Sequence, residues 1–143
     1  MTPMKNTPDA KPTAETDDRF PSGEWKGFFQ QPKTRRHEMT LNLGFCEGRL
    51  HGDGVDCVGD FELKGRYDLN SGEVWIHKAY RMHRVIYKGF NEGKGIWGIW
   101  ELPGQDKGGF HIWPKGMRDP TINELEAHAL VPVEAKPLVV VAE

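Results

Sequence analysis

The sequence DFELKGRY, residues 60–67, alternates charged and apolar side chains along its length. Successive side chains of a β-strand point to opposite faces of a sheet. The segment therefore predicts a strand that directs Phe61, Leu63 and Tyr67 into an apolar interior and its charged side chains into water.

Seven further runs with this alternation lie between Trp25 and Trp113, and short breaks rich in Gly, Pro, Asn and Asp separate them. Hairpins of this length join antiparallel neighbours, and eight such strands are enough to close one barrel. The predicted fold is all-β: an eight-stranded antiparallel up-and-down barrel with a short C-terminal helix, whose interior is filled by side chains or holds one small ligand. The expected strands are residues 24–30, 37–45, 49–56, 60–67, 73–80, 83–90, 95–102 and 107–113.

The length of 143 residues favours a single domain. Residues 1–20 are rich in Pro, Thr, Asp and Lys, so we expect a disordered N-terminal tail, followed by the barrel domain at residues 21–115. Residues 116–143 are expected to form a C-terminal helix and an extended tail, because Thr121 and Glu124 match a capping box.

The charge is nearly balanced, with 19 basic and 21 acidic residues, which favours neither nucleic acid nor an anionic membrane as a partner. No apolar run approaches the ~20 residues that span a bilayer. The first residues lack the apolar segment of a signal peptide, so we expect a cytoplasmic protein. Cys46 and Cys57 flank opposite ends of the third strand, which predicts free thiols.

The same alternation places several polar side chains in the interior, and the antiparallel strand directions bring them towards one end of the barrel. Apolar residues such as Trp25 and Phe45 close the other end. The barrel is therefore expected to have a polar mouth and an apolar floor. The interior polar residues are His37, Asp56, Lys78, Tyr80, His83 and Tyr87.

Three explanations of these residues stay open. Lys78 and Asp56 form a satisfied structural pair, because an unpaired buried charge is costly. Alternatively they belong to a small-molecule site, in which Lys78 neutralises an anionic group and Trp100 adds to the apolar wall. As a third alternative, Lys78, Tyr80 and His83 perform acid–base catalysis of an isomerisation or cyclisation. The predicted ligand-binding residues are His37, Asp56, Lys78, Tyr80, His83, Tyr87 and Trp100.

Motifs for metals and cofactors are absent from the sequence. Residues 51–60, HGDGVDCVGD, do not match the spacing of an EF-hand loop. A metal held by His37, His83 and Asp56 is a minor alternative, because two histidines and one carboxylate form a common ligand set. The prediction is no metal and no cofactor.

Gly23-Glu24-Trp25 opens the first strand and resembles the G-x-W motif with which lipocalin and avidin-type barrels, the calycins, begin. In those barrels the Trp plugs the closed end, where the alternation independently places Trp25. A helix after the eighth strand is similar to the lipocalin arrangement. The chain lacks the long lid loop after the first strand and an avidin-like biotin-site pattern. The resemblance implies small-molecule binding without naming a ligand.

The outward positions of the last four strands are unusually apolar, which is typical of an interface. Either the C-terminal residues cover this surface or a homodimer forms through Trp75, Trp97 and Trp113. A structural or interaction module that uses this face is therefore a further alternative function. The outward residues concerned are Trp75, His77, Ile86, Phe90, Trp97, Ile99 and Trp113.

Overall fold

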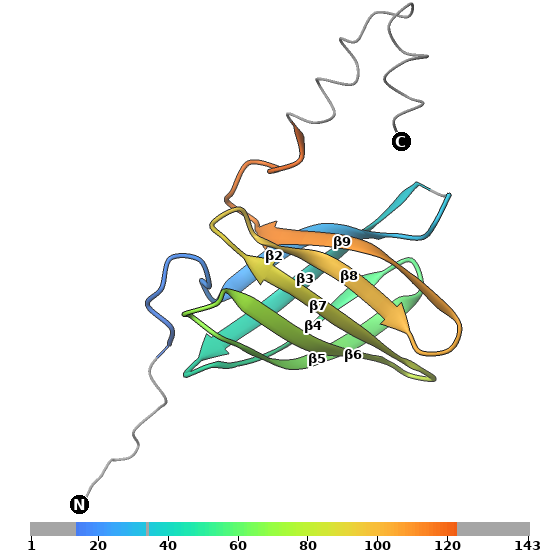
Figure 1. The fold of residues 1–143 in the computed structure, drawn as a ribbon, viewed down its shortest axis with the longest axis horizontal. Coiled ribbons are helices and arrows are strands. Elements are labelled where there is room, and N and C mark those ends of the chain that lie inside the picture. Colours follow the sequence, from blue (N-terminus) through green and yellow to red (C-terminus); the bar gives the residue numbers. More distant parts are fainter. Residues whose placement is uncertain (1–13, 34, 123–143) are drawn as a thin grey trace, which may run out of the picture.

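The structure is a computed structural model that describes residues 14–33 and 35–122. Every strand boundary lies within one residue of the boundary expected from the sequence. Figure 1 shows the strands crossing one another as the wall of a barrel. The strands are β2 (Gly23–Gln30), β3 (Arg36–Cys46), β4 (Arg49–Asp56), β5 (Gly59–Tyr67), β6 (Glu73–Tyr80), β7 (Arg84–Asn91), β8 (Ile96–Leu102) and β9 (Asp106–Pro114).

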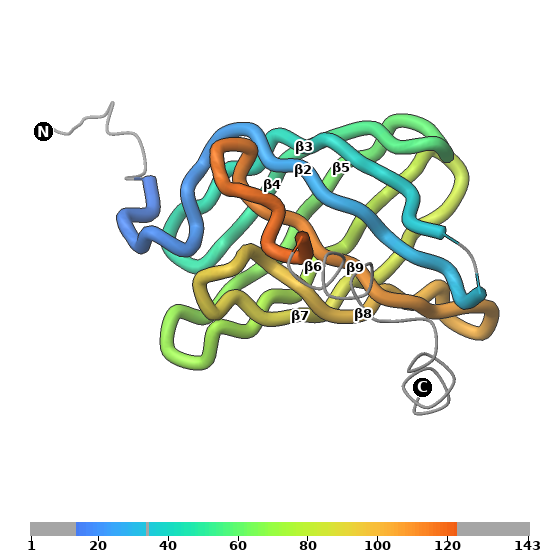
Figure 2. Tube along the Cα trace, turned by 90° about the horizontal axis from the view of Figure 1, so that it is seen from above, coloured from blue at the N-terminus to red at the C-terminus, as the bar shows by residue number. Residues whose placement is uncertain are grey.

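All neighbouring strands pair antiparallel in chain order, and β2 pairs with β9 to close the barrel. The closing ladder runs from Trp25 opposite Pro114 to Gln30 opposite Gly109. Figure 2 shows the same closed wall from above, with the strands tilted against its long axis. The predicted all-β, eight-stranded antiparallel barrel is confirmed, and its closure leaves none of the eight described strands with an edge for another chain to extend.

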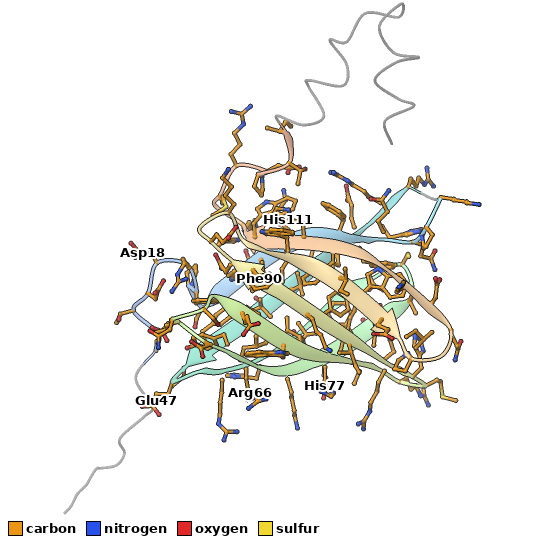
Figure 3. The ribbon with its side chains drawn as sticks, in the orientation of Figure 1. Asp18, Glu47, Arg66, His77, Phe90 and His111 are labelled. Carbon is orange, nitrogen blue, oxygen red and sulfur yellow. The ribbon has the colours of Figure 1, made fainter. Side chains whose placement is uncertain are left out.

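The predicted inward face is the buried one. In β5, Phe61, Leu63 and Tyr67 are buried, whereas the charged residues between them are exposed. Figure 3 shows Arg66 and, on the neighbouring strand, His77 directed away from the barrel. Both cysteines are free thiols, as predicted; Cys46 is half-buried and Cys57 is exposed.

The residues before β2 close one end of the barrel. Phe20 is fully buried, and its ring centroid lies 4.6 Å from that of Tyr67 and 5.5 Å from that of Phe45. The Tyr67 hydroxyl donates to Glu15 Oε1 at 2.5 Å. The structure thus corrects the predicted tail of residues 1–20: residues 14–20 belong to the fold, because Phe20 covers the aromatic floor. Residues 1–13 lie outside the described part.

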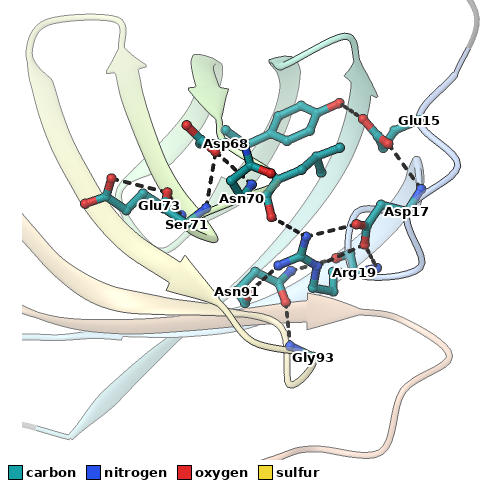
Figure 4. Close-up of polar contacts among 11 residues, drawn as sticks. Glu15, Asp17, Arg19, Asp68, Asn70, Ser71, Glu73, Asn91 and Gly93 are labelled. Atoms are coloured by element: carbon teal, nitrogen blue, oxygen red, sulfur yellow. Dashed lines mark hydrogen bonds and ion pairs between the residues drawn. The ribbon is translucent and has the colours of Figure 1, made fainter.

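Arg19 fixes this segment to the strands beneath it (Figure 4). Its guanidinium forms an ion pair with Asp17 at 2.9 Å and donates to the Leu69 carbonyl at 2.8 Å. The buried Asn91 amide donates to the Arg19 carbonyl at 2.6 Å. Hydrogen bonds from the Arg19 side chain and backbone lower the pKa of Asp17 to about 2.

The chain after β9 crosses the outer surface of β2 and β9. Arg36 donates to the Thr121 hydroxyl at 3.0 Å and lies 4.0 Å from the Phe28 ring centroid. Trp113 packs against Phe28 and His111 and is only 3% exposed. Trp113, which the sequence places in a possible dimer face, is thus covered by packing within its own chain.

The predicted helix falls almost wholly on residues 123–143, outside the described residues. Within residues 14–33 and 35–122, no helix has the length and apolar content needed to cross a membrane.

Candidate functional site

The end of the barrel opposite Phe20 carries the connections from β2 to β3, β4 to β5, β6 to β7 and β8 to β9, at the right of Figure 1. Antiparallel register brings distant residues together here. Asp56 lies opposite Met39, and Tyr80 lies opposite Phe61. Lys78 is one inward step deeper, opposite Leu63. The convergence expected from the alternation is therefore present.

Lys78 and Asp56 form a buried ion pair at the centre of this end. Lys78 Nζ lies 2.7 Å from Asp56 Oδ2, and the two side chains are 1% and 0% exposed. Lys78 Nζ also donates to the Tyr87 hydroxyl at 3.1 Å and contacts Met39 Sδ at 3.6 Å. The Tyr80 hydroxyl donates to Asp56 Oδ2 at 2.5 Å. The contacts satisfy the charged groups, as the structural explanation of these residues requires.

The second carboxylate oxygen of Asp56 fixes the adjoining turn. Asp56 Oδ1 accepts hydrogen bonds from the backbone N–H groups of Val58, at 2.8 Å, and Gly59, at 3.3 Å. The same side chain therefore joins the interior network to the rim of the barrel.

Four aromatic rings surround the Lys78 ammonium. Its nitrogen lies 4.2 Å from the Phe61 centroid, and cation–π contact stabilises an ammonium at such a position. Gly54 makes room for this ring, since a Cβ at that position would lie 2.7 Å from the Phe61 Cζ. The other three ring centroids, at 5.0–5.2 Å, belong to Phe29, Tyr80 and Tyr87.

Burial and pairing act against each other in the pKa values of the network. Burial raises the pKa of Asp56, but hydrogen bonds from Lys78 and Tyr80 and the Lys78 charge outweigh it, so the net shift is downward. Burial lowers the pKa of Lys78, and Asp56 offsets only part of that effect. As an ion pair, Lys78 and Asp56 together carry no net charge.

Both interior tyrosines remain neutral phenols. Burial, reinforced by the hydrogen bond to Asp56, raises the pKa of Tyr80. Burial and the charge of Asp56 raise the pKa of Tyr87. The two hydroxyls therefore keep their protons as hydrogen-bond donors near neutral pH.

A small hollow of about 100 Å³ lies above this network at the open end. Trp100 forms part of its wall and is held by a hydrogen bond from its indole N–H to the Gln30 carbonyl, at 3.0 Å. His83 is exposed at the rim and stacks on Tyr80, with 4.7 Å between centroids. The described lining residues are Phe29, Gln31, Val58, Tyr80, His83, Val85, Tyr87, Trp100, Leu102 and Asp106.

The predicted site residues thus divide into two groups. Tyr80, His83, Tyr87 and Trp100 line the hollow. Asp56, Lys78 and His37 do not belong to the described lining; the first two support Tyr80 and Tyr87 from beneath.

His37 supports the wall in another way. Its ring stacks on Phe29 at 5.0 Å, and Nδ1 lies 3.6 Å from Cys57 Sγ. Among the described atoms, its buried Nε2 has no hydrogen-bond partner.

Some residues that line the hollow are not among the ligand-binding residues predicted from the sequence. Val85 and Leu102 share the inward face, so the alternation was enough to suggest them. Gln31, Val58 and Asp106 lie in or beside connections, where no period of two exists to place a side chain.

A larger hollow, of about 1190 Å³, is lined mainly by outward residues of β2 to β6. Charges of both signs line it, including Arg36, Glu38, Asp60 and Arg81. Met39, Phe61 and Tyr80 also belong to its lining, but most of its lining residues point outward, so the smaller hollow at the open end is the better candidate site.

The predicted minor metal set is not assembled. In the described part of the chain, no three His, Cys, Asp or Glu side chains lie together as metal ligands would. His83 stacks on Tyr80, whereas His37 contacts Phe29 and Cys57.

Comparison of the chain with protein-family models, curated proteins and solved structures gives no match. The closed eight-stranded barrel is consistent with calycin-like architecture. Evidence about function therefore comes from the geometry of the open end.

Proposed function

We propose that this protein binds a small, neutral, partly apolar molecule in the hollow at the open end of its barrel. The proposal is based on the position and the hydrogen bonding of Tyr87. Tyr87 lines the hollow, and its hydroxyl accepts a hydrogen bond from Lys78 at 3.1 Å. No acceptor for its own proton is found among the described residues, so that proton is available to a ligand.

The ligand therefore needs an acceptor atom, such as a carbonyl oxygen. A hydroxyl that accepts a bond from an ammonium is polarised and becomes a stronger donor. Phe29, Val85 and Trp100 supply an apolar wall for the rest of the molecule. An apolar pocket with few, well-placed polar groups is the usual form of a small-molecule site.

The volume of the hollow and the charges around it restrict the class of ligand further. An apolar cavity of ~150 Å³ accommodates benzene, so a hollow of about 100 Å³ suits a molecule of about six non-hydrogen atoms or fewer. Asp56 already neutralises Lys78, which removes the support for an anionic ligand expected from the sequence. A carboxylate in the hollow would lose hydration without gaining a free cation.

Cyclopentanone is a suitable probe, and methylenecyclopentane is its matched control because only the acceptor oxygen is replaced. We expect cyclopentanone to shift the Trp100 indole N–H signal saturably in NMR. Methylenecyclopentane should bind ~10-fold more weakly, as expected for one net hydrogen bond. Cyclopropanecarboxylate, which also has six non-hydrogen atoms but carries a negative charge, should bind more weakly still.

Two tyrosine variants test the assigned donor. Tyr87→Phe should remove the preference for cyclopentanone, whereas Tyr67→Phe, at the opposite end, should keep it. No saturable shift with any probe, or equal binding of the carboxylate, would overturn the proposal.

The acid–base alternative has weaker support. His83 lines the hollow, but Lys78 does not belong to the described lining, and Tyr80 already donates its proton to Asp56. A general acid or base must reach the atom that it protonates or deprotonates. Binding is therefore the function that this geometry supports best.

A further inference from the structure

The connections at the open end of the barrel are basic. They contain Lys33, Arg35 and Arg81 but neither Asp nor Glu. Arg84, the first residue of β7, adds a further cation, and all of these basic residues are exposed. Cations therefore surround the mouth of the hollow. The connections concerned are residues 31–35, 57–58, 81–83 and 103–105.

The carboxylates near these connections lie farther back, on the strands. Asp106 begins β9 beside Lys107, and Glu101 of β8 lies opposite Lys107. Asp60 is on the outer face of β5, and Asp56 is paired with Lys78 inside the barrel. The charges closest to the tips of the connections are thus the basic ones.

The opposite end has the reverse composition. In residues 14–22 and in the connections 47–48, 68–72 and 92–95, the basic residues are Arg19 and Lys94. Figure 3 shows Asp18 and Glu47 at this end. Because the two ends offset each other, the nearly balanced total charge does not reveal their separation. The acidic residues in these segments are Glu15, Asp17, Asp18, Glu47, Asp68 and Glu92.

Each connection at the open end also exposes an apolar side chain. Met82 and Val58 are 86% and 55% exposed, more than any other large hydrophobic residue in the described part of the chain. Met82 lies directly after Arg81 in the chain. Pro32 and Pro103 are exposed in the other two connections. Apolar groups and cations therefore project together from this end.

A partner for this end has to offer anionic groups and an apolar phase at the same time. The apolar side chains project from separate connections and do not form one flat patch, so a rigid protein face would have to match each of them. The interface of a bilayer is fluid, and it accepts apolar side chains to a depth of ~5–10 Å while anionic headgroups attract Lys and Arg. A membrane surface is therefore the partner that fits best.

We propose that the open end docks on the surface of a bilayer that contains anionic lipids. Met82 and Val58 enter the interface, and Lys33, Arg81 and Arg84 face the headgroups. Repulsion of the acidic opposite end orients the molecule, so that the mouth of the hollow is directed towards the lipid. Docking goes beyond ligand binding in the hollow and does not require it.

Sedimentation of the full chain with sucrose-loaded vesicles tests the proposal. We expect binding to vesicles of phosphatidylcholine and phosphatidylserine in equal parts, release by added salt, and no binding to phosphatidylcholine alone. Arg81→Glu/Arg84→Glu should weaken binding at least ~10-fold. Arg49→Glu/Lys94→Glu is the matched control, because it reverses the same number of exposed charges at the opposite end, and it should bind as the wild type does.

A second variant separates a membrane from other anionic partners. Met82→Ser leaves the charge unchanged and should weaken vesicle binding ~5-fold or more, because an apolar side chain is lost from the interface. Absence of binding to the anionic vesicles, or equal loss in both charge variants, would overturn the proposal. Unchanged binding of Met82→Ser would also overturn it and indicate an acidic protein as the partner. Since no probe for the hollow is present, these outcomes leave the cyclopentanone experiments to decide ligand binding separately.

Discussion

Lys78 Nζ lies 2.7 Å from Asp56 Oδ2, and neither side chain reaches water. The pair links three strands, because Lys78 belongs to β6, Asp56 ends β4, and Tyr87 of β7 accepts the next hydrogen bond of the ammonium. Each charge is tolerated in the interior only because the other is present.

Removal of one partner should therefore lower the free energy of unfolding more than replacement of both partners. Lys78→Met leaves the Asp56 carboxylate buried and unpaired, and should lower the free energy of unfolding by ~3–5 kcal/mol. Lys78→Met/Asp56→Asn should lose much less, because the Asn oxygen still accepts from the turn N–H groups and carries no charge. Urea unfolding measures the free energy of unfolding of each variant. If the double variant loses as much as Lys78→Met and Asp56→Asn lose together, the two charges do not depend on each other.

The lowered pKa of Asp56 predicts acid sensitivity with a definite sign. A carboxyl whose pKa is lower in the folded state than its ordinary 3.8 adds stability above pH 3.8, and that stability is lost as the pH falls through the folded value. The free energy of unfolding should fall below about pH 4 in the wild type. In Asp56→Asn the free energy of unfolding should fall less steeply with decreasing pH. An equally steep fall would show that other carboxyl groups cause the acid sensitivity.

Phe20 gives a test of the closed end. Phe20→Ala opens a cavity between Phe45 and Tyr67 and should cost ~3–5 kcal/mol, as large aromatic truncations in cores do. The Tyr67 pKa, which burial and Glu15 raise to about 12, should fall towards its ordinary 10.0 in this variant. Ultraviolet titration of the phenol measures the shift, and an unchanged titration would argue against a plug formed by residues 14–20.

The two cysteines should differ in reactivity. Cys57 is exposed, whereas Cys46 is half-buried, and burial, followed by Glu47 and Glu15, raises the pKa of Cys46. Because the thiolate is the reactive form, iodoacetamide at neutral pH should modify Cys57 first. Peptide mass spectrometry follows the two sites separately, and faster modification of Cys46 would be inconsistent with the structure.

The alternation of residues 60–67 and of the seven other runs was sufficient to predict the wall, its closure and the convergence of Lys78 and Asp56, because a period of two with known strand directions fixes both the face and the height of each residue. It was not sufficient for Phe20 or Trp113. Phe20 lies in an irregular segment, which carries no periodic signal. Trp113 packs against outward side chains of β2 and β9, Phe28 and His111, and the alternation does not describe such packing. The same limit applies to Val58, whose place at the hollow is set by the turn that Asp56 holds.

The proposed site requires that the hollow takes a neutral acceptor ligand and that Tyr87 donates a hydrogen bond to it. A crystal structure of the protein soaked with cyclopentanone is the decisive measurement. We expect density between Trp100 and Tyr80, with the carbonyl oxygen ~2.7 Å from the Tyr87 hydroxyl. Density only on the outer surface, or a probe oxygen directed away from Tyr87, would contradict it.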